Sequence, residues 1–206
     1  MKYDEKTAGA VLLKNLDIFN KTAVYFENEI SNTIFSEVSH AVKAWADGRE
    51  WHFGDEGDGC FEELWVAPGQ WKNGENNYYA WFQLQRRYGH DSASYEIADL
   101  FGVGQTEFGI VFLVDHSEFG GRKAWNGYAK TLDEIGMELG KRGWAHSGKG
   151  VFFLPLMLPA DRLSDAWESE EWSAVVEPLE RALEQLVHDI PVFDRLIEGA
   201  KSVADK

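Results

Sequence analysis

The stretch Phe108–Asp115, with the sequence FGIVFLVD, decides the fold of this chain. Its residues Ile110–Val114 form a run without polar side chains. A strand need not alternate polar and apolar residues when both of its faces are covered, which is the situation at the middle of a sheet. The stretch therefore predicts the central strand of a β-sheet.

The residues before this stretch predict more strands. Between residues 50 and 115 the apolar pattern has a period of two, with intervening loops rich in Gly, Asn and Asp. The predicted strands are Glu50–Phe53, Phe61–Val66, Tyr78–Arg87, Tyr95–Ala98 and Phe108–Asp115. Alternation along the third of them places Tyr79, Trp81, Gln83, Gln85 and Arg87 on one face.

Residues 1–48 predict helices, because their apolar residues recur at steps of three or four from Leu12 to Trp45. A helix of that length is unusual, so we expect a break near residues 20–22, where Asn20 would cap a second helix. Gly48 is expected to end it.

Residues 121–206 predict a helix, a strand and two further helices. The helical spacing of Trp125–Leu139 precedes a strand at Val151–Leu158, in which Pro155 indicates an edge or a bend. Helices are expected over Glu170–Asp189 and, after Pro191, over Phe193–Lys201. The order predicts one α+β domain spanning residues 1–206, in which N-terminal helices and two C-terminal helices pack on a mostly antiparallel sheet.

Charge and cysteine content restrict the possible functions. The chain has 206 residues and a net charge of −15, so its mean field repels nucleic acid and anionic membranes. Its one cysteine, Cys60, excludes an internal disulfide and favours a cytoplasmic location. We find no apolar segment long enough to target or span a membrane, so no membrane partner is expected.

Several motifs resemble catalytic sites without meeting their requirements. Residues Gly143–Gly150 match a phosphate loop until Gly150, which stands where a Ser or Thr should bind Mg²⁺. The six histidines show no short metal-ligand spacing. Cys60 lies among acids, which should raise the pKa of its thiol and make it a poor nucleophile. These motifs therefore identify no catalytic residue, and we expect neither a cofactor nor a metal.

The order of elements resembles the core of restriction-endonuclease-like nucleases. That resemblance implies an acid on one strand and an acid-x-Lys pair on the next, which together position Mg²⁺ and water. The long strand offers Gln83-Leu84-Gln85 instead, and no predicted strand has an acid two residues before a lysine. The resemblance therefore implies an inactive relative more readily than an active nuclease.

Tryptophans and acids supply the candidate binding residues. The chain has nine tryptophans. Its acids concentrate near residues 50–63 and in Asp161–Glu184, a segment that contains eight acids and only two arginines. Core packing of the aromatic rings and a solvated helix face are the ordinary explanations. The functional alternative is a surface for a basic partner, for which we select Asp55, Glu56, Asp58, Glu62, Trp81, Glu177, Glu180 and Glu184.

Two hypotheses follow from the sequence. The first is a non-catalytic acidic protein, such as an immunity protein or inhibitor, that occupies a basic or nucleic-acid-binding surface of its partner. The second is a metal-dependent, nuclease-like hydrolase whose site assembles from Glu62, Asp115, His116 and Glu118. Convergence of the acids in a cleft would favour the enzyme, and a spread over convex faces would favour the binder.

Overall fold

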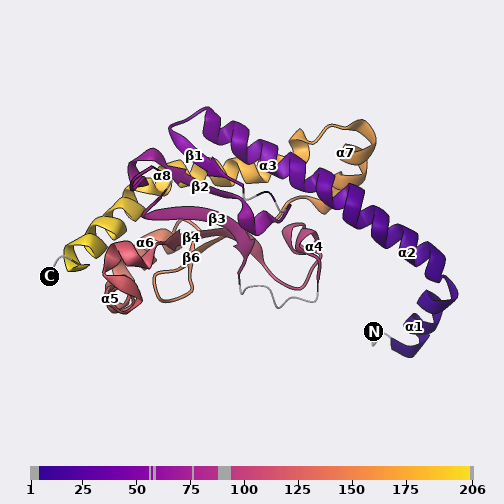
Figure 1. The fold of residues 1–206 in the computed structure, drawn as a ribbon, viewed down its shortest axis with the longest axis horizontal. Helices are drawn as coiled ribbons and strands as arrows, with labels where there is room; N and C mark the ends of the chain where they lie inside the picture. The colour runs from indigo at the N-terminus through magenta and orange to yellow at the C-terminus, as the bar shows by residue number, and fades with distance from the viewer. Residues whose placement is uncertain (1–4, 56, 58, 76, 88–93, 205–206) are drawn as a thin grey trace.

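The computed structural model describes residues 5–55, 57, 59–75, 77–87 and 94–204, and shows one sheet with helices packed against it (Figure 1). Within these residues the sheet has six strands in the order β1-β2-β3-β4-β6-β5, and each of its pairings is antiparallel. The strands are β1 Trp51–Gly54, β2 Trp65–Pro68, β3 Ala80–Arg86, β4 Phe108–Val114, β5 Ala145–His146 and β6 Phe152–Pro155. The predicted α+β class is confirmed.

The middle of the sheet is the pair β3 and β4. These two strands align over their whole length, from Ala80 opposite Val114 to Arg86 opposite Phe108. Strand β4 also pairs with β6, so both of its edges are bonded, and six of its seven residues are buried. The prediction that this stretch forms the centre of the sheet is confirmed.

The N-terminal helices break at a different residue from the predicted one. Helix α1 spans Glu5–Lys14, and α2 (Leu16–Tyr25) continues through a π-helical segment, Phe26–Ile30, into α3 (Ser31–Asp47). The break is at Asn15, whose side-chain Nδ2 donates a hydrogen bond to the carbonyl oxygen of Val11 at 2.9 Å. Asn20 lies inside α2 and caps nothing, so the predicted break near residues 20–22 is wrong. Gly48 ends α3 as predicted.

The C-terminal segment forms one long helix where two were predicted. Helix α8 runs unbroken over Ser173–Ala204 and contains Pro191. A proline inside a helix typically costs about 3 kcal/mol because it removes a hydrogen bond. Here its neighbours Ile190, Val192 and Phe193 are all buried, and that packing holds the helix together across the proline.

The region between the sheet and α8 also differs in detail from the prediction. The expected single helix over Trp125–Leu139 is divided into α5 (Gly121–Tyr128) and α6 (Asp133–Gly140) by a 3₁₀ turn. Helix α7 covers Leu163–Ser169. Strand β6 is not an edge strand, because it pairs with β4 on one side and β5 on the other. Pro155 is its last residue and lies beyond the end of the two-residue strand β5. No hydrogen bond to β5 is therefore lost through the missing N–H of Pro155.

Two predicted strands have another local structure. Phe61–Glu63 forms a 3₁₀ turn, and only Trp65–Pro68 of that region pairs as β2. Tyr95–Ala98 was expected to be a strand, but helix α4 covers Glu96–Leu100. The four residues were too few to separate a strand period from a helical one.

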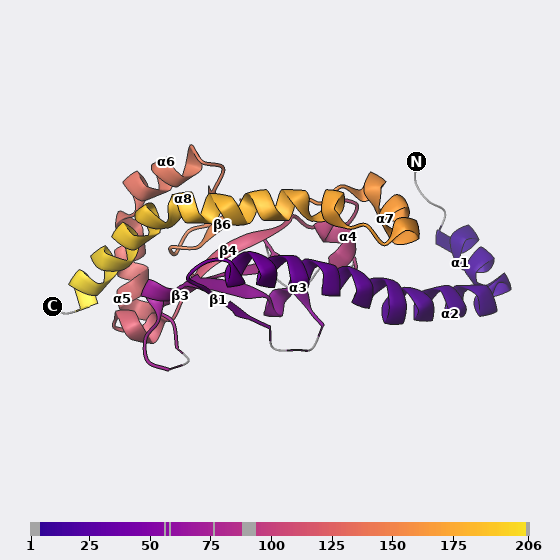
Figure 2. The same cartoon turned by 90° about the horizontal axis from the view of Figure 1, so that it is seen from above.

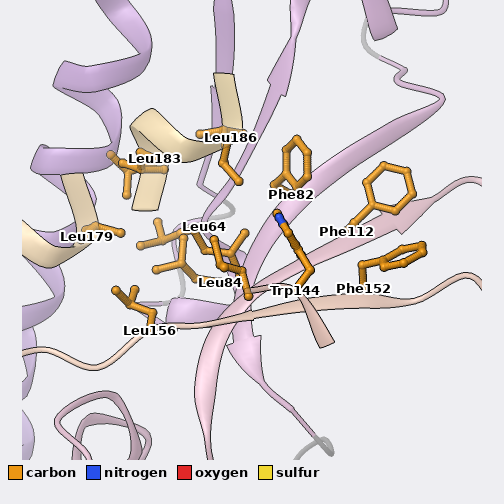
Figure 3. Packing of buried hydrophobic residues seen from close by; sticks show 14 of the residues in the cluster. Leu64, Phe82, Leu84, Phe112, Trp144, Phe152, Leu156, Leu179, Leu183 and Leu186 are labelled. Carbon is orange, nitrogen blue, oxygen red and sulfur yellow. The ribbon is translucent and has the colours of Figure 1, made fainter. Parts of the chain in front are cut away.

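The core lies between the sheet and two helices that run side by side over one of its faces, α3 and α8 (Figures 1 and 2). Phe193 of α8 meets the rings of Phe82 and Phe112 at centroid distances of 5.1 and 4.5 Å. Leu179, Leu183 and Leu186 cover the same layer with no exposed surface (Figure 3). The alternate residues of β3 therefore lie on the opposite, outer face.

Candidate functional site

The outer face of the sheet carries Trp65, Trp81 and Gln83. Trp65 of β2 lies opposite Gln83 of β3 in the antiparallel register, and all three side chains are half-buried. In contrast, Phe82 and Leu84 on the inner face are buried. The outer face is therefore where aromatic side chains of the sheet reach solvent.

A hollow opens on this outer face. Its volume is ≈ 320 Å³, and we call it the aromatic-acidic hollow because of its lining. Three carboxylates, three aromatic rings and two amides form its wall, namely Glu62, Glu63, Asp115, Trp65, Tyr78, Trp81, Asn77 and Gln83. Since none of these eight residues is Lys or Arg, the lining carries a negative charge.

The amide of Gln83 fixes the wall of the hollow. The indole Nε1 of Trp81 donates to Gln83 Oε1 at 2.9 Å. The Nε2 of Gln83 in turn donates to the backbone carbonyl oxygen of Glu62. One side-chain amide thus joins an aromatic ring of β3 to the acidic 3₁₀ turn that precedes β2. Trp81 and Glu62, which we selected from the sequence, are brought together here.

Aromatic packing forms another part of the wall. The rings of Trp65 and Tyr78 lie 5.1 Å apart between centroids, and Tyr78 also meets His52 at 5.4 Å. Trp65 lies directly over Gly54, where an added Cβ would come within 2.0 Å of the indole. A larger residue at position 54 would clash with this ring, so the packing of Trp65 requires glycine there. Burial raises the pKa of Tyr78, so its hydroxyl remains a neutral donor at pH 7.

Asp115 brings a fixed negative charge to the hollow. It directly follows β4, and its Oδ1 accepts hydrogen bonds from Ser117 Oγ at 2.6 Å and Ser117 N at 2.9 Å. These hydrogen bonds lower the pKa of Asp115. A lowered carboxyl pKa keeps the group ionised at lower pH, so Asp115 is charged at every pH near neutrality.

The other acids selected near residues 50–63 lie elsewhere. Asp55 follows β1, and its two carboxylate oxygens accept from Gly57 N at 2.9 Å and from Ser39 Oγ of α3 at 3.2 Å. Asp55 therefore joins its own loop to α3 and does not line the hollow. Glu56 and Asp58 lie outside the described residues.

The three acids selected on α8 border a second depression, of ≈ 460 Å³, on the helical side between α3 and α8. Glu177 is 3.9 Å from Arg181 in an exposed i, i+4 ion pair, and Glu180 is exposed. Glu184 accepts from Trp45 Nε1 at 3.0 Å and forms an ion pair with Arg49. Because α8 covers the inner face of the sheet, this groove and the aromatic-acidic hollow are on different sides of the molecule.

The residues of the hydrolase hypothesis are dispersed. Glu62 and Asp115 line the hollow, whereas the ring of His116 packs against Trp125 at a centroid distance of 5.9 Å. Glu118 accepts from Asn73 Nδ2 at 2.6 Å. Within the described ranges, no group of three or more His, Cys, Asp or Glu side chains has a geometry that could hold a metal ion.

Two motifs from the sequence have structural explanations. Burial raises the pKa of Cys60 to about 11, with a contribution from the nearby carboxylate of Glu96, which confirms the predicted direction. The phosphate-loop lookalike contains β5 and the turn into β6, and the indole of Trp125 donates to the carbonyl oxygen of Lys149 at 2.7 Å. An added Cβ at Gly150 would come within 2.7 Å of that indole, so close ring packing requires this glycine.

Of the three rings that line the hollow, only Trp81 was selected from the sequence, and Trp65 and Tyr78 were missed. Regular alternation placed Tyr79 beside Trp81, yet Tyr78 lines the hollow. Strand β3 begins only at Ala80, so the period of two does not extend to these residues. Tyr79 instead packs against Phe119, and Lys201 Nζ lies 3.4 Å from its ring centroid. Tyr78 itself forms an isolated antiparallel bridge with Lys72, outside β3.

Comparison of the chain with known protein families, with curated proteins and with solved structures found no match. In the ranges that the structure describes, no helix combines the length and the apolar character that crossing a membrane requires. The site therefore has to be interpreted from its own chemistry.

Proposed function

We propose that this chain is a non-catalytic acidic protein that binds a basic protein, or an enzyme that handles nucleic acid, and occupies the basic surface of that partner. An immunity protein or an inhibitor is a protein of this kind. The observation that carries the proposal is the aromatic-acidic hollow, which three carboxylates and the rings of Trp65, Tyr78 and Trp81 line together. Acids that converge in a cleft are the feature expected of the hydrolase, but only Glu62 and Asp115 of its four residues line this hollow. Rings beside carboxylates suit the binding of a cation, so we favour the binder.

The lining of the hollow suits a cationic side chain. A guanidinium group stacks on aromatic rings and pairs with carboxylates, and such contacts gain strength when water is partly excluded. Trp81 supplies a half-buried ring that the amide of Gln83 holds in place, and Asp115 supplies the carboxylate. We therefore assign arginine as the preferred occupant, with Trp81 as the stacking ring and Asp115 as the anion.

The overall charge supports the same kind of partner. A net charge of −15 attracts basic surfaces over a distance and repels phosphate backbones. Attraction of this kind accelerates encounter more than it lengthens the lifetime of a complex. The hollow would add the local contacts that hold a particular residue of the partner. Nucleic acid itself is not proposed as a ligand.

The test is the recovery of partners on immobilised protein at low and high salt, with two variants in parallel. Trp81→Ala combined with Asp115→Asn removes the ring and the anion of the hollow. Asp161→Asn is the control, because Asp161 is an exposed acid outside the hollow. We expect wild-type protein and the control to retain the same basic proteins at low salt, and the hollow variant to lose them. Equal retention by all three proteins would contradict the role of the hollow.

A further inference from the structure

Exposed apolar side chains concentrate in one short part of the molecule. Fourteen large apolar residues are exposed in the described ranges, and eight of these lie between Val11 and Tyr25. Isolated exposed apolar residues are ordinary, whereas a contiguous group marks an interaction surface. The eight are Val11, Leu12, Leu13, Leu16, Ile18, Phe19, Val24 and Tyr25, with exposed fractions from 46% to 72%.

These residues belong to α1 and α2, which extend away from the rest of the molecule (Figures 1 and 2). We call residues 5–25 the arm. Helix α2 has no buried residue. At the base of the arm, Tyr25 meets Trp167 of α7 at a centroid distance of 6.4 Å, and Phe26 meets Tyr95 at 5.1 Å. The body thus holds the base of the arm and leaves most of it uncovered.

One apolar stripe runs along α2 and into the core. Within α2, Leu16, Phe19 and Ala23 follow one another at steps of three and four residues, which is the seam spacing of paired helices. The stripe continues with Phe26 and Ile30, which pack against the core, and with the buried Ile34 and Val38. The body covers the apolar stripe from Phe26 onward, and the arm continues the same stripe outside the body.

The charges of the arm are arranged away from this stripe. The positions of α2 that flank it, Asn20 and Thr22, are both uncharged. Asp17 and Lys21 fall on the opposite side of a helix with that period. Flanking charges of one sign would repel their counterparts in an identical chain. Their absence from these positions lets the same stripe of two chains meet without repulsion.

The net charge of the arm distinguishes it from the rest of the chain. Residues 5–25 contain three lysines and two acids, a net charge of +1, so the remaining residues total −16. Two copies of so acidic a body repel each other when their surfaces approach. The arm is nearly neutral and projects outward, so contact through it keeps the two bodies apart.

From these observations we infer that the arm docks on the arm of a second copy of this chain. The α2 helices of the two copies pair along the stripe of Leu16, Phe19 and Ala23, and the interface is the same patch on both copies. Such a symmetric contact closes on itself and yields a dimer. The inference is independent of the proposed function, because it uses neither the hollow nor the acidic surface.

The experiment measures molar mass by sedimentation velocity over a range of protein concentrations. The wild-type mass should rise from 23.4 kDa towards twice that value as the concentration increases. The test variant is Leu16→Glu combined with Phe19→Glu, which places charges in the seam. It should remain monomeric throughout that range, with a dissociation constant raised at least about tenfold, a change of about 1.4 kcal/mol. Its melting temperature at low concentration should equal that of the wild type, because both side chains are exposed.

A matched control separates the seam from general apolar exposure. Val103→Glu combined with Met137→Glu changes the charge by the same amount at residues that are 70% and 64% exposed and lie outside the arm. This control should dimerise like the wild type. A wild-type protein that stays monomeric, or a seam variant that dimerises like the control, would overturn the inference. So would binding of monomeric wild type to phosphatidylcholine vesicles that the seam variant lacks, because the arm would then bind lipid.

Discussion

The arm and the aromatic-acidic hollow are two exposed surfaces of one chain with opposite chemistry. The arm has eight exposed large apolar residues and a net charge of +1, whereas the hollow has three acids and no basic residue in its lining. The two surfaces also differ in how firmly the rest of the molecule holds them. The hydrogen bonds of Gln83 fix the wall of the hollow, whereas no residue of α2 is buried in the core. Under the two proposals, exposure has a different meaning at each place: apolar pairing at the arm, and recognition of a cation at the hollow.

The largest expected effect separates the body from the arm. Leu179→Ala or Leu183→Ala should lower the free energy of unfolding by about 2–5 kcal/mol, because both side chains are fully buried between α8 and the sheet. The same substitution at Leu16, which is 56% exposed, should change it by no more than about 0.5 kcal/mol in dilute protein. Urea unfolding at low protein concentration measures all three. A loss at Leu16 as large as at Leu179 would mean that the arm packs on its own body.

The next effect tests the chemistry of the hollow. Trp81→Ala should weaken binding of a basic partner by about 2 kcal/mol, the loss usual for an aromatic residue at the centre of an interface. Trp167→Ala is a suitable comparison, because Trp167 is a half-buried tryptophan of α7 that meets the base of the arm. Titration calorimetry with a partner recovered on the wild-type protein measures both affinities. If the two variants lose the same affinity, the hollow has no special part in binding.

Salt should act on the two surfaces in opposite directions. Raising the ionic strength from about 0.02 M to about 0.5 M shortens the screening distance from about 20 Å to about 4 Å. Binding at the hollow should weaken by about tenfold, since attraction of the acidic protein for a basic partner is screened. Pairing of the arms should strengthen by a few-fold, because the repulsion between two acidic bodies is screened. Sedimentation velocity and calorimetry in the same buffers measure the two trends, and a common direction would mean that one of the surfaces is misassigned.

The sequence predicted what periodicity controls. The uninterrupted run Ile110–Val114 correctly indicated the centre of the sheet. Pro191 was misinterpreted, since a local rule predicts a break there, and only the burial of Val192 and Phe193 in the folded protein outweighs it. Tertiary packing keeps the helix intact at Pro191, and the neighbouring residues of the sequence do not reveal that packing.

The candidate site was less accessible to sequence reasoning. Glu62 and Trp81 were selected from composition, and they do share the hollow. Tyr79 was assigned to the face of Trp81 in place of Tyr78, because alternation was extended past the first residue of β3. The acids of α8 belonged to the same hypothesis as those near residue 60, but the fold places them on another side of the sheet. A count of charges along the chain contains no information about which face they will occupy.

The smallest expected effect concerns two of those acids, and it tests whether an exposed acid of α8 stabilises the protein itself. Glu184→Ala should lower the free energy of unfolding by about 1 kcal/mol, because it removes the acceptor of Trp45 Nε1 and the ion-pair partner of Arg49. Glu180→Ala, one turn earlier on the helix, should change it by less than about 0.5 kcal/mol, as is usual at a surface position.

Both substitutions change the net charge equally and introduce the same helix-favouring residue, so their difference reports the contacts of Glu184 alone. Urea unfolding in parallel measures that difference. Equal stabilities would show that the bond between α3 and α8 contributes nothing, and Glu184 would return to the acids that are open to a partner. A clear loss at Glu184 removes it from that group and leaves Glu177 and Glu180 as the exposed acids of the groove.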